Sequence, residues 1–353
     1  MRIHQVLAGA AAGDAITNIA INTREVLRRY GESEIYANHI DSTAEHVIRP
    51  LRSLAPGEPG DVVILRASIG DADIFAALAD RPDRLWIAYH NISPPELFTE
   101  LDPTFARLLA DGRAQVRALS SRCSAASADS TFNAVDLRGL GYDDVTVIPP
   151  LLDPFRLQSL VPDPGFALEI ERRAPGTVIV FVGQLLPHKR PELLIAAHHL
   201  LTAHHQPDAT LVLVGTPRFP DYASQLARFA TALNLPRVWF TGRLEDEELA
   251  ALYRRADVFV TASSHEGFCV PLIEAMASST PIVATPVGAV PETVGSGGLL
   301  LEEVSPEAIA EALDLATSSA VSSELVLAGR QRARELSVEA SEERLVAFLE
   351  AHL

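Results

Sequence analysis

The chain has 353 residues, 48% of them hydrophobic, and a formal net charge of −17 at pH 7. This length exceeds that at which a single core stops growing, so we expect two domains. The acidic balance argues against a nucleic-acid binder, and no apolar run reaches the roughly 20 residues of a membrane-spanning helix. Two cysteines give no disulfide framework or metal cluster and favour a reducing, cytoplasmic setting.

The first half of the chain alternates apolar, strand-like runs with helical periodicity, which is typical of parallel α/β architecture. One helix is predicted over residues 16–29, where the apolar side chains share a face. The strands of this half are predicted at residues 3–7, 34–37, 62–65, 85–89, 118–125 and 145–148.

A proline-rich stretch at residues 149–154 indicates a connection between domains. We therefore predict one Rossmann-like domain over residues 1–155 and a second over residues 156–353. The last helix is a candidate to cross back to the first domain. The second domain is expected to have strands at 177–182, 209–214, 238–241, 258–261 and 282–284, followed by helices at 305–318, 324–336 and 339–353.

Lys189 is the only lysine of the chain. It follows the apolar run 178–182 and a turn at Gly183, and a helix is expected to begin just after it. A compact ammonium and free helix amides past the carboxyl end of a parallel strand commonly hold an anionic ligand. A solvated loop lysine is the alternative interpretation.

Two glutamates follow the predicted strand 258–261: Glu266 in a loop and Glu274 in the helix after it. Gly267 lets the backbone approach a ligand, and the next three amides, those of Phe268, Cys269 and Val270, are donors at the helix N-terminus. A carboxylate accepts two hydrogen bonds from vicinal hydroxyls, which suits a sugar or ribose. The alternative is that both glutamates are solvated or cap the helix.

The segment from Glu266 to Glu274 resembles the Glu-x7-Glu signature of retaining glycosyltransferases with the GT-B fold, specifically family 4 (glycosyl transferases group 1). Residues 241–258 are similar to the family segment before this signature, and residues 281–292 are similar to the family segment after it. The resemblance covers nearly the whole chain. It implies an α/β fold of two Rossmann-like domains that face each other across a cleft.

The resemblance also implies roles for single residues. Lys189 would bind the donor diphosphate, Glu266 the donor sugar and Glu274 the ribose. Further donor-binding residues would be Gly183, Gln184, Arg190, Arg243, Gly267, Phe268, Cys269 and Val270. The family often has an arginine where this chain has Gln184, so Arg190 or a cation of the first domain, with Arg66 as candidate, would have to replace its charge.

In the first domain, residues 11–15 resemble the loop that approaches the diphosphate and the acceptor in relatives. Gly13 is the candidate for close approach, and Asp14 either contacts the acceptor or caps the next helix. His90, at the end of a predicted strand, resembles the active-site histidine that hydrogen-bonds the donor sugar. The other histidines, including the pairs at 198–199 and 204–205, are interpreted as surface residues and not as a metal site.

Together these assignments predict a retaining, metal-independent hexosyltransferase without a cofactor, with His90, Lys189 and Glu266 as catalytic candidates. The donor would be a GDP- or UDP-linked hexose, and the acceptor a small molecule, a glycan or a lipid-linked molecule. Two alternatives stay open: another GT-B activity, such as a phosphorylase or sugar-nucleotide epimerase, and a non-catalytic nucleotide-sugar-binding subunit. The expected location is the cytoplasm, with a peripheral position at the inner membrane face left open.

Overall fold

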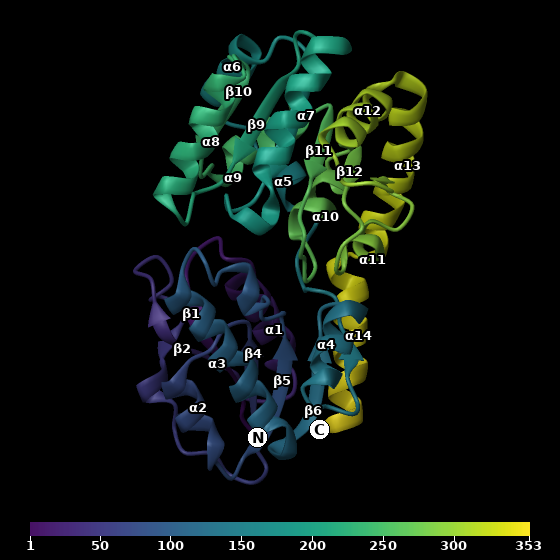
Figure 1. The fold of residues 1–353 in the computed structure, drawn as a ribbon. Helices are drawn as coiled ribbons and strands as arrows, with labels where there is room; N and C mark the ends of the chain where they lie inside the picture. The colour runs from purple at the N-terminus through teal and green to yellow at the C-terminus, as the bar shows by residue number, and fades with distance from the viewer. The chain divides into compact units, whose positions relative to one another are not determined.

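The computed structural model describes residues 1–353, which form two compact units (Figure 1). Unit 1 comprises Met1–Leu152 and Ser337–Leu353, and unit 2 comprises Asp153–Leu336. Each unit contains one sheet in which all neighbouring strands are parallel. None of the helices combines the length and the apolarity needed to span a membrane.

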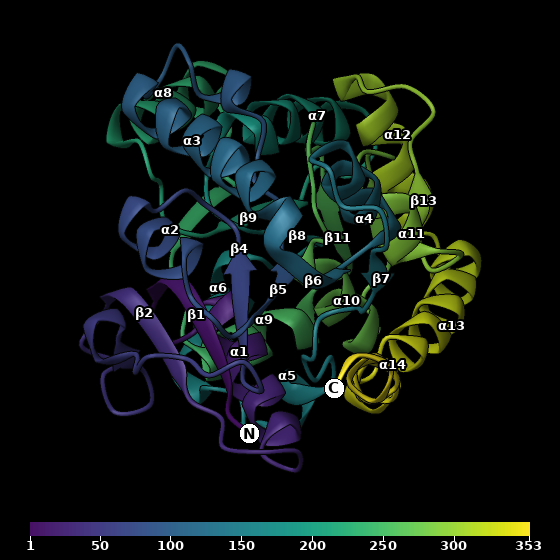
Figure 2. The same cartoon turned by 90° about the horizontal axis from the view of Figure 1, so that it is seen from below.

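The sheet of unit 1 has seven strands in the order β3-β2-β1-β4-β5-β6-β7, and Figure 2 shows β2, β1, β4, β5, β6 and β7 one after another. The strand order reverses between β1 and β4, and ligands of open α/β sheets bind at such a point, beyond the carboxyl ends of the strands. The strands are β1 (Ile3–Ala10), β2 (Ile35–Ile40), β3 (Arg49–Pro50), β4 (Val62–Ala67), β5 (Arg84–Tyr89), β6 (Cys123–Ala128) and β7 (Thr146–Val147).

The helices of unit 1 include the last helix of the chain, α14. Its Phe348 packs edge-on against Trp86 of β5, with ring centroids 5.4 Å apart, in a core that also contains Ile3 and Leu349. The helices are α1 (Ala15–Leu27), α2 (Ala72–Ala79), α3 (Pro103–Leu119), α4 (Thr131–Gly139) and α14 (Val338–His352), with 3-10 turns at η1 (Leu51–Ser53), η2 (Pro95–Leu97) and η3 (Ser120–Arg122).

The sheet of unit 2 has six strands in the order β10-β9-β8-β11-β12-β13 and reverses between β8 and β11. Both faces of β8 are buried, because Ile179 and Phe181 belong to one core and Val178 and Val180 to another. This explains the continuous apolar run in the sequence. The strands are β8 (Val178–Val182), β9 (Thr210–Val214), β10 (Val238–Gly242), β11 (Val258–Thr261), β12 (Ile282–Ala284) and β13 (Leu299–Leu300).

The helices of unit 2 connect these strands and follow the last one. They are α5 (Arg156–Ser159), α6 (Pro164–Arg173), α7 (Pro191–His204), α8 (Pro220–Ala232), α9 (Asp246–Arg255), α10 (Val270–Ala277), α11 (Val290–Val294), α12 (Pro306–Thr317) and α13 (Ser319–Glu335), with a 3-10 turn at η4 (Pro187–Lys189). The helices predicted near residues 305, 324 and 339 are thus confirmed as α12, α13 and α14.

Most predicted strands are confirmed, with ends that differ by a few residues, but the strand predicted at 118–125 was wrong. Its first residues complete α3, whose buried face includes Val116 and Leu119, and β6 begins only at Cys123. The β6 sequence consists of Cys, Ser and Ala, which have little intrinsic strand preference. Hydrogen bonding to β5 and β7 therefore determines this strand.

Candidate functional site

In unit 2, the predicted site residues lie in two loops that follow β8 and β11, the strands between which the order reverses. The first loop ends in η4 with Lys189, and the second carries Glu266. The backbone N–H of Ser264 donates to the carbonyl of His188 at 2.7 Å, which ties the two loops together. The sheet topology therefore brings side chains that are 77 positions apart into one place.

Lys189 and Glu266 form an ion pair, with 2.6 Å between Nζ and Oε1 and side-chain exposures of 20% and 7%. The Ser263 hydroxyl donates to the same oxygen at 2.7 Å, and the Thr261 hydroxyl lies 2.9 Å from that of Ser263. Burial alone would lower the pKa of Lys189 and raise that of Glu266, but their mutual attraction outweighs it. The pKa of Lys189 is raised and that of Glu266 lowered, so both groups stay charged.

A second segment supports the backbone of Glu266. The N–H of Ala289 donates to the Glu266 carbonyl at 3.0 Å. Gly288 has a φ of 57°, and a Cβ added there would lie 2.1 Å from the same carbonyl oxygen. Only glycine permits both this left-handed conformation and this close approach. The glycine that follows the signature in sequence therefore holds the Glu266 loop in place.

Helix α10 begins directly after this loop. Its N-cap, Cys269, has a left-handed φ of 69°, and the carbonyl of Phe268 accepts a bond from the Thr293 hydroxyl at 2.8 Å. Burial raises the pKa of the Cys269 thiol well above its usual range, so the thiol is neutral. The amides of residues 268–270 thus lie at a helix N-terminus, where the helix dipole favours an anion.

Glu274, one turn into α10, differs from Glu266 in having no ion-pair partner of its own. The Tyr253 hydroxyl lies 3.5 Å from Oε2. The cation that acts on it, Arg156, is itself bound to Asp246. Burial raises the pKa of Glu274 to about 7, and Arg156 opposes this only in part. Near neutral pH this carboxyl is therefore divided between its protonated and ionised forms.

The other predicted donor-binding residues of unit 2 are more dispersed. Gln184 is exposed, and Arg190 is the left-handed N-cap of α7, with a φ of 51°. Arg243 is exposed just after β10, the edge strand, which β9 separates from β8. Gly183 directly follows β8, and a Cβ on Gly215 would lie 2.0 Å from its carbonyl oxygen. The structure thus unites Lys189 with Glu266 but places Arg243 at the far edge of the sheet.

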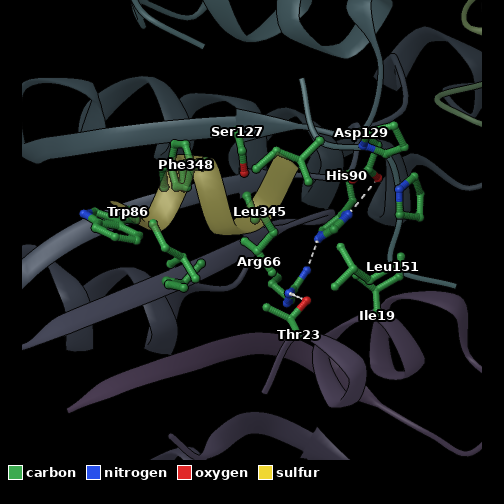
Figure 3. A pocket seen from close by; sticks show the side chains of 17 residues that line it. Ile19, Thr23, Arg66, Trp86, His90, Ser127, Asp129, Leu151, Leu345 and Phe348 are labelled. Atoms are coloured by element: carbon green, nitrogen blue, oxygen red, sulfur yellow. Dashed lines mark hydrogen bonds and ion pairs between the residues drawn. The ribbon is translucent and has the colours of Figure 1, made fainter. Parts of the chain in front are cut away.

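In unit 1, His90 and Arg66 are brought together in a buried network (Figure 3). Arg66, 4% exposed, donates to the Thr23 hydroxyl and the Gln5 side-chain oxygen, both at 2.7 Å, and contacts His90 at 3.0 Å. Burial lowers the pKa of Arg66 to about 10, and Asp129 opposes this shift. The guanidinium is directed to internal partners, so the structure does not support Arg66 as the cation missing at Gln184.

The loop after β1 places Gly13 and Asp14 at the surface. Asp14 Oδ2 accepts bonds from the backbone N–H and the hydroxyl of Thr17, at 2.8 and 2.9 Å. Of the two roles considered for Asp14, the structure shows helix capping. Gly13 has a left-handed φ of 76°, which places the turn just before this cap.

One histidine expected at the surface is buried: His198 is 1% exposed, and its Nε2 lies 2.9 Å from the Ala209 carbonyl. That interpretation was wrong because His198 lies on the face of α7 that packs on the sheet. Nowhere in the structure do three or more His, Cys, Asp or Glu side chains converge as metal ligands would.

Two residues of these networks were missed from the sequence. Asp129 directly follows β6, as His90 follows β5, and strand ends of a parallel sheet lie along one edge. Ending β6 at residue 125 removed Asp129 from consideration. Ser263 could have been found from its position two residues beyond β11 and the need of a buried Glu266 for donors.

Comparison with known proteins identifies the segment that carries this geometry. Residues 169–335, nearly all of unit 2, match the family described as glycosyl transferases group 1. This part of the chain belongs to that family. The Lys189–Glu266 pair, α10 and Gly288 all fall within the matched glycosyl transferases group 1 segment.

Curated relatives show the same similarity. The D-inositol 3-phosphate glycosyltransferase of Corynebacterium glutamicum is 35% identical over 182 residues, 48% of this chain and 43% of the relative. The alpha-maltose-1-phosphate synthase of Mycolicibacterium smegmatis is 30% identical over 231 residues, 60% of this chain and 58% of the relative. The chain therefore spans about half the length of the curated relatives it matches.

Solved structures extend the likeness to the whole chain. Anabaena Alr3699/HepE in complex with UDP-glucose aligns with a TM-score of 0.76 at 20% identity, covering 99% of this chain and 100% of that one. WaaG, a glycosyltransferase involved in lipopolysaccharide biosynthesis, aligns with a TM-score of 0.72 at 15% identity, covering 97% and 98%. The predicted fold class is confirmed: the group 1 segment is half of a GT-B fold with two Rossmann-like units.

Proposed function

We propose that this protein is a retaining glycosyltransferase that moves a hexose from a nucleoside diphosphate to an acceptor hydroxyl. The observation that carries the proposal is the buried Lys189–Glu266 pair beside the N-terminus of α10, inside a glycosyl transferases group 1 segment. The names of the curated relatives and the UDP-glucose bound to Alr3699/HepE support the choice of a nucleotide-sugar donor.

The charges of the site fit a diphosphate. An ammonium has three donors, so Lys189 can keep its bond to Glu266 and still donate to a phosphate oxygen. The amides at the start of α10 add donors and a favourable dipole. Glu274, when ionised, can accept both hydroxyls of a ribose, and this need explains a half-buried carboxylate without its own cation.

The same geometry indicates how the reaction proceeds. Negative charge develops on the leaving diphosphate, and Lys189 with the α10 amides is already oriented to stabilise it. Glu266 is held by Lys189 and Ser263 with a lowered pKa, so it is suited to binding sugar hydroxyls and poorly suited to attacking carbon. In the proposed reaction the departing phosphate accepts the proton of the acceptor hydroxyl, on the face of the sugar that it leaves.

A second candidate is a nucleotide-sugar-binding subunit without turnover. It is favoured by the uncharged Gln184 and by the internal position of Arg66, which leave the diphosphate with fewer cations than expected. Donor binding with no transfer and no hydrolysis would support this candidate.

The deciding experiment incubates the protein with UDP- and GDP-linked hexoses and a panel of acceptors, and follows the products by mass spectrometry. The proposal predicts acceptor plus one hexose with release of nucleoside diphosphate, and loss of that product in Lys189→Ala. Phosphate-dependent turnover would indicate a phosphorylase, and acceptor-free conversion of the donor an epimerase. Either result would contradict the proposal.

A further inference from the structure

A buried chain of contacts in unit 1 links a cation to a carboxylate through an imidazole (Figure 3). Arg66 Nη1 lies 3.0 Å from His90 Nε2, and His90 Nδ1 lies 2.8 Å from Asp129 Oδ2. The His90 side chain is 3% exposed and that of Asp129 is 13% exposed. These residues lie in β4 or directly after β5 and β6, three adjacent strands, so the sheet itself sets their spacing.

The donors and acceptors of this chain fix the position of one proton. A guanidinium can only donate, so His90 Nε2 must accept from Arg66. The proton of a neutral ring is then on Nδ1, which donates to Asp129. In a catalytic triad the corresponding Nε2 faces the nucleophile and takes its proton. Here that nitrogen is occupied, so His90 is not arranged as a general base.

Arg66 is held from three sides, because its Nε and Nη2 donate to Gln5 and Thr23. Gln5 is fixed in turn by donating to the Ala20 carbonyl at 3.0 Å. The negative charge that acts on Arg66 is that of Asp129, on the other side of the ring. Removal of Asp129 would leave a buried cation without an anion, and removal of Arg66 would leave the reverse.

The ring also anchors a turn at the edge of the sheet where α/β proteins bind ligands. Asn91, the next residue, has a left-handed φ of 69° and donates through its side chain to Asn133 of α4 at 3.1 Å. A fixed His90 ring therefore fixes the backbone at the point where β5 ends.

We propose that Asp129 and Arg66 are positioning residues for sugar transfer, which act by holding His90 as the neutral tautomer with its proton on Nδ1. This inference rests on the proposed function for its effect on catalysis. The tautomer itself is a property of the free protein and is tested separately.

The first test is ¹⁵N NMR of the ligand-free full chain labelled in histidine, with His90 among 11 histidines assigned by comparison with His90→Asn. The expected spectrum has a protonated, pyrrole-type Nδ1 and an unprotonated, pyridine-type Nε2. A proton on Nε2, whether alone or together with one on Nδ1, would overturn the proposal. This result does not depend on whether the protein transfers sugar.

The second test compares steady-state kinetics of Asp129→Ala and Asp129→Asn. Alanine should lower kcat about ten- to a hundredfold, the scale of loss for a small misplacement near a reacting group, with donor KM nearly unchanged. Asparagine keeps an acceptor for Nδ1–H and should restore part of kcat. Asp111→Ala, an exposed change on α3, is the control and should behave like the wild type.

If Asp129→Ala fails to fold, Arg66→Met combined with Asp129→Asn removes both charges and avoids an uncompensated buried ion. This double variant should fold and still show the loss in kcat. A wild-type kcat in either Asp129→Ala or the double variant would contradict the positioning role. A wild type without transfer would instead refute the proposed function and leave the tautomer result standing.

Discussion

Replacement of Glu274 by glutamine should stabilise unit 2 at alkaline pH and at the same time weaken nucleotide binding. The reason is the burial of this carboxyl in α10, which raises its pKa from 4.5 to about 7. Glutamine keeps the shape and an acceptor oxygen for the Tyr253 hydroxyl, but it carries no charge. A loss of stability, which simple removal of a buried hydrogen-bonding group would suggest, is therefore not expected.

The sign and size of the effect follow from proton linkage. In the unfolded chain the carboxyl ionises near 4.5, whereas in the folded protein it ionises near 7, so the folded state binds more protons between these values. Wild-type stability should fall as pH rises through this window and then level off. At about 1.4 kcal/mol per pKa unit, the stabilisation by Glu274→Gln above pH 7 is at most about 3 kcal/mol.

The assay can isolate unit 2 because the chain has two tryptophans, Trp86 in β5 and Trp239 in β10. In a Trp86→Phe background, fluorescence reports on Trp239 and thus on unit 2. Urea unfolding at pH 5 and pH 8 should show the Glu274→Gln advantage mainly at pH 8. Glu311→Gln, an exposed change on α12, is the matched control and should show no such difference.

Calorimetry on the same variants tests the binding role. Ionised Glu274 is proposed to accept ribose hydroxyls, so wild-type affinity for nucleoside diphosphate should rise from pH 6 to pH 8. Glu274→Gln should lower affinity about tenfold at pH 8, the value of a hydrogen bond to a charged group. Equal stability of variant and wild type at pH 8, or destabilisation there, would refute the assigned pKa.

Three further outcomes are expected. Lys189→Ala should weaken donor binding about ten- to a hundredfold and destabilise unit 2, because Glu266 then stays buried without its cation; in a double-mutant cycle, adding Glu266→Gln should recover much of the lost stability. Gly288→Ala should lower both stability and kcat, since the new methyl would displace the Glu266 carbonyl, whereas Gly139→Ala, which meets nothing within 4 Å, should be tolerated in the same thermal and kinetic assays. Turnover should survive EDTA, because Lys189 and the α10 amides are proposed to meet the diphosphate charge; loss on chelation with recovery on Mg²⁺ would contradict this.

The fold could be predicted where the sequence carries strong local patterns. The apolar runs of β8, β9 and β11 are long enough to identify buried parallel strands, and the residues that follow them include Lys189 and Glu266. Strand β6 and the two-residue strands β3 and β13 could not be located in this way, because pairing with neighbours and not side-chain preference determines them.

The site could be predicted in its residue types but not in its contacts. The charges of Lys189 and Glu266 suggested separate ligand contacts, whereas the structure pairs them. Arg66 was expected to supply a cation to the ligand, and only three-dimensional packing shows that its guanidinium is directed inward to Gln5 and Thr23. The raised pKa of Glu274 likewise depends on burial, which no spacing in the sequence reveals.

The central claim is sugar transfer with retention at the site built around Lys189 and Glu266. Its most direct test is ¹H NMR of the product formed from an α-linked UDP- or GDP-hexose and an acceptor found in the panel. The account predicts an α-linked hexose from the wild type and none from Lys189→Ala. A β-linked product, or donor binding without any transfer or hydrolysis, would contradict it.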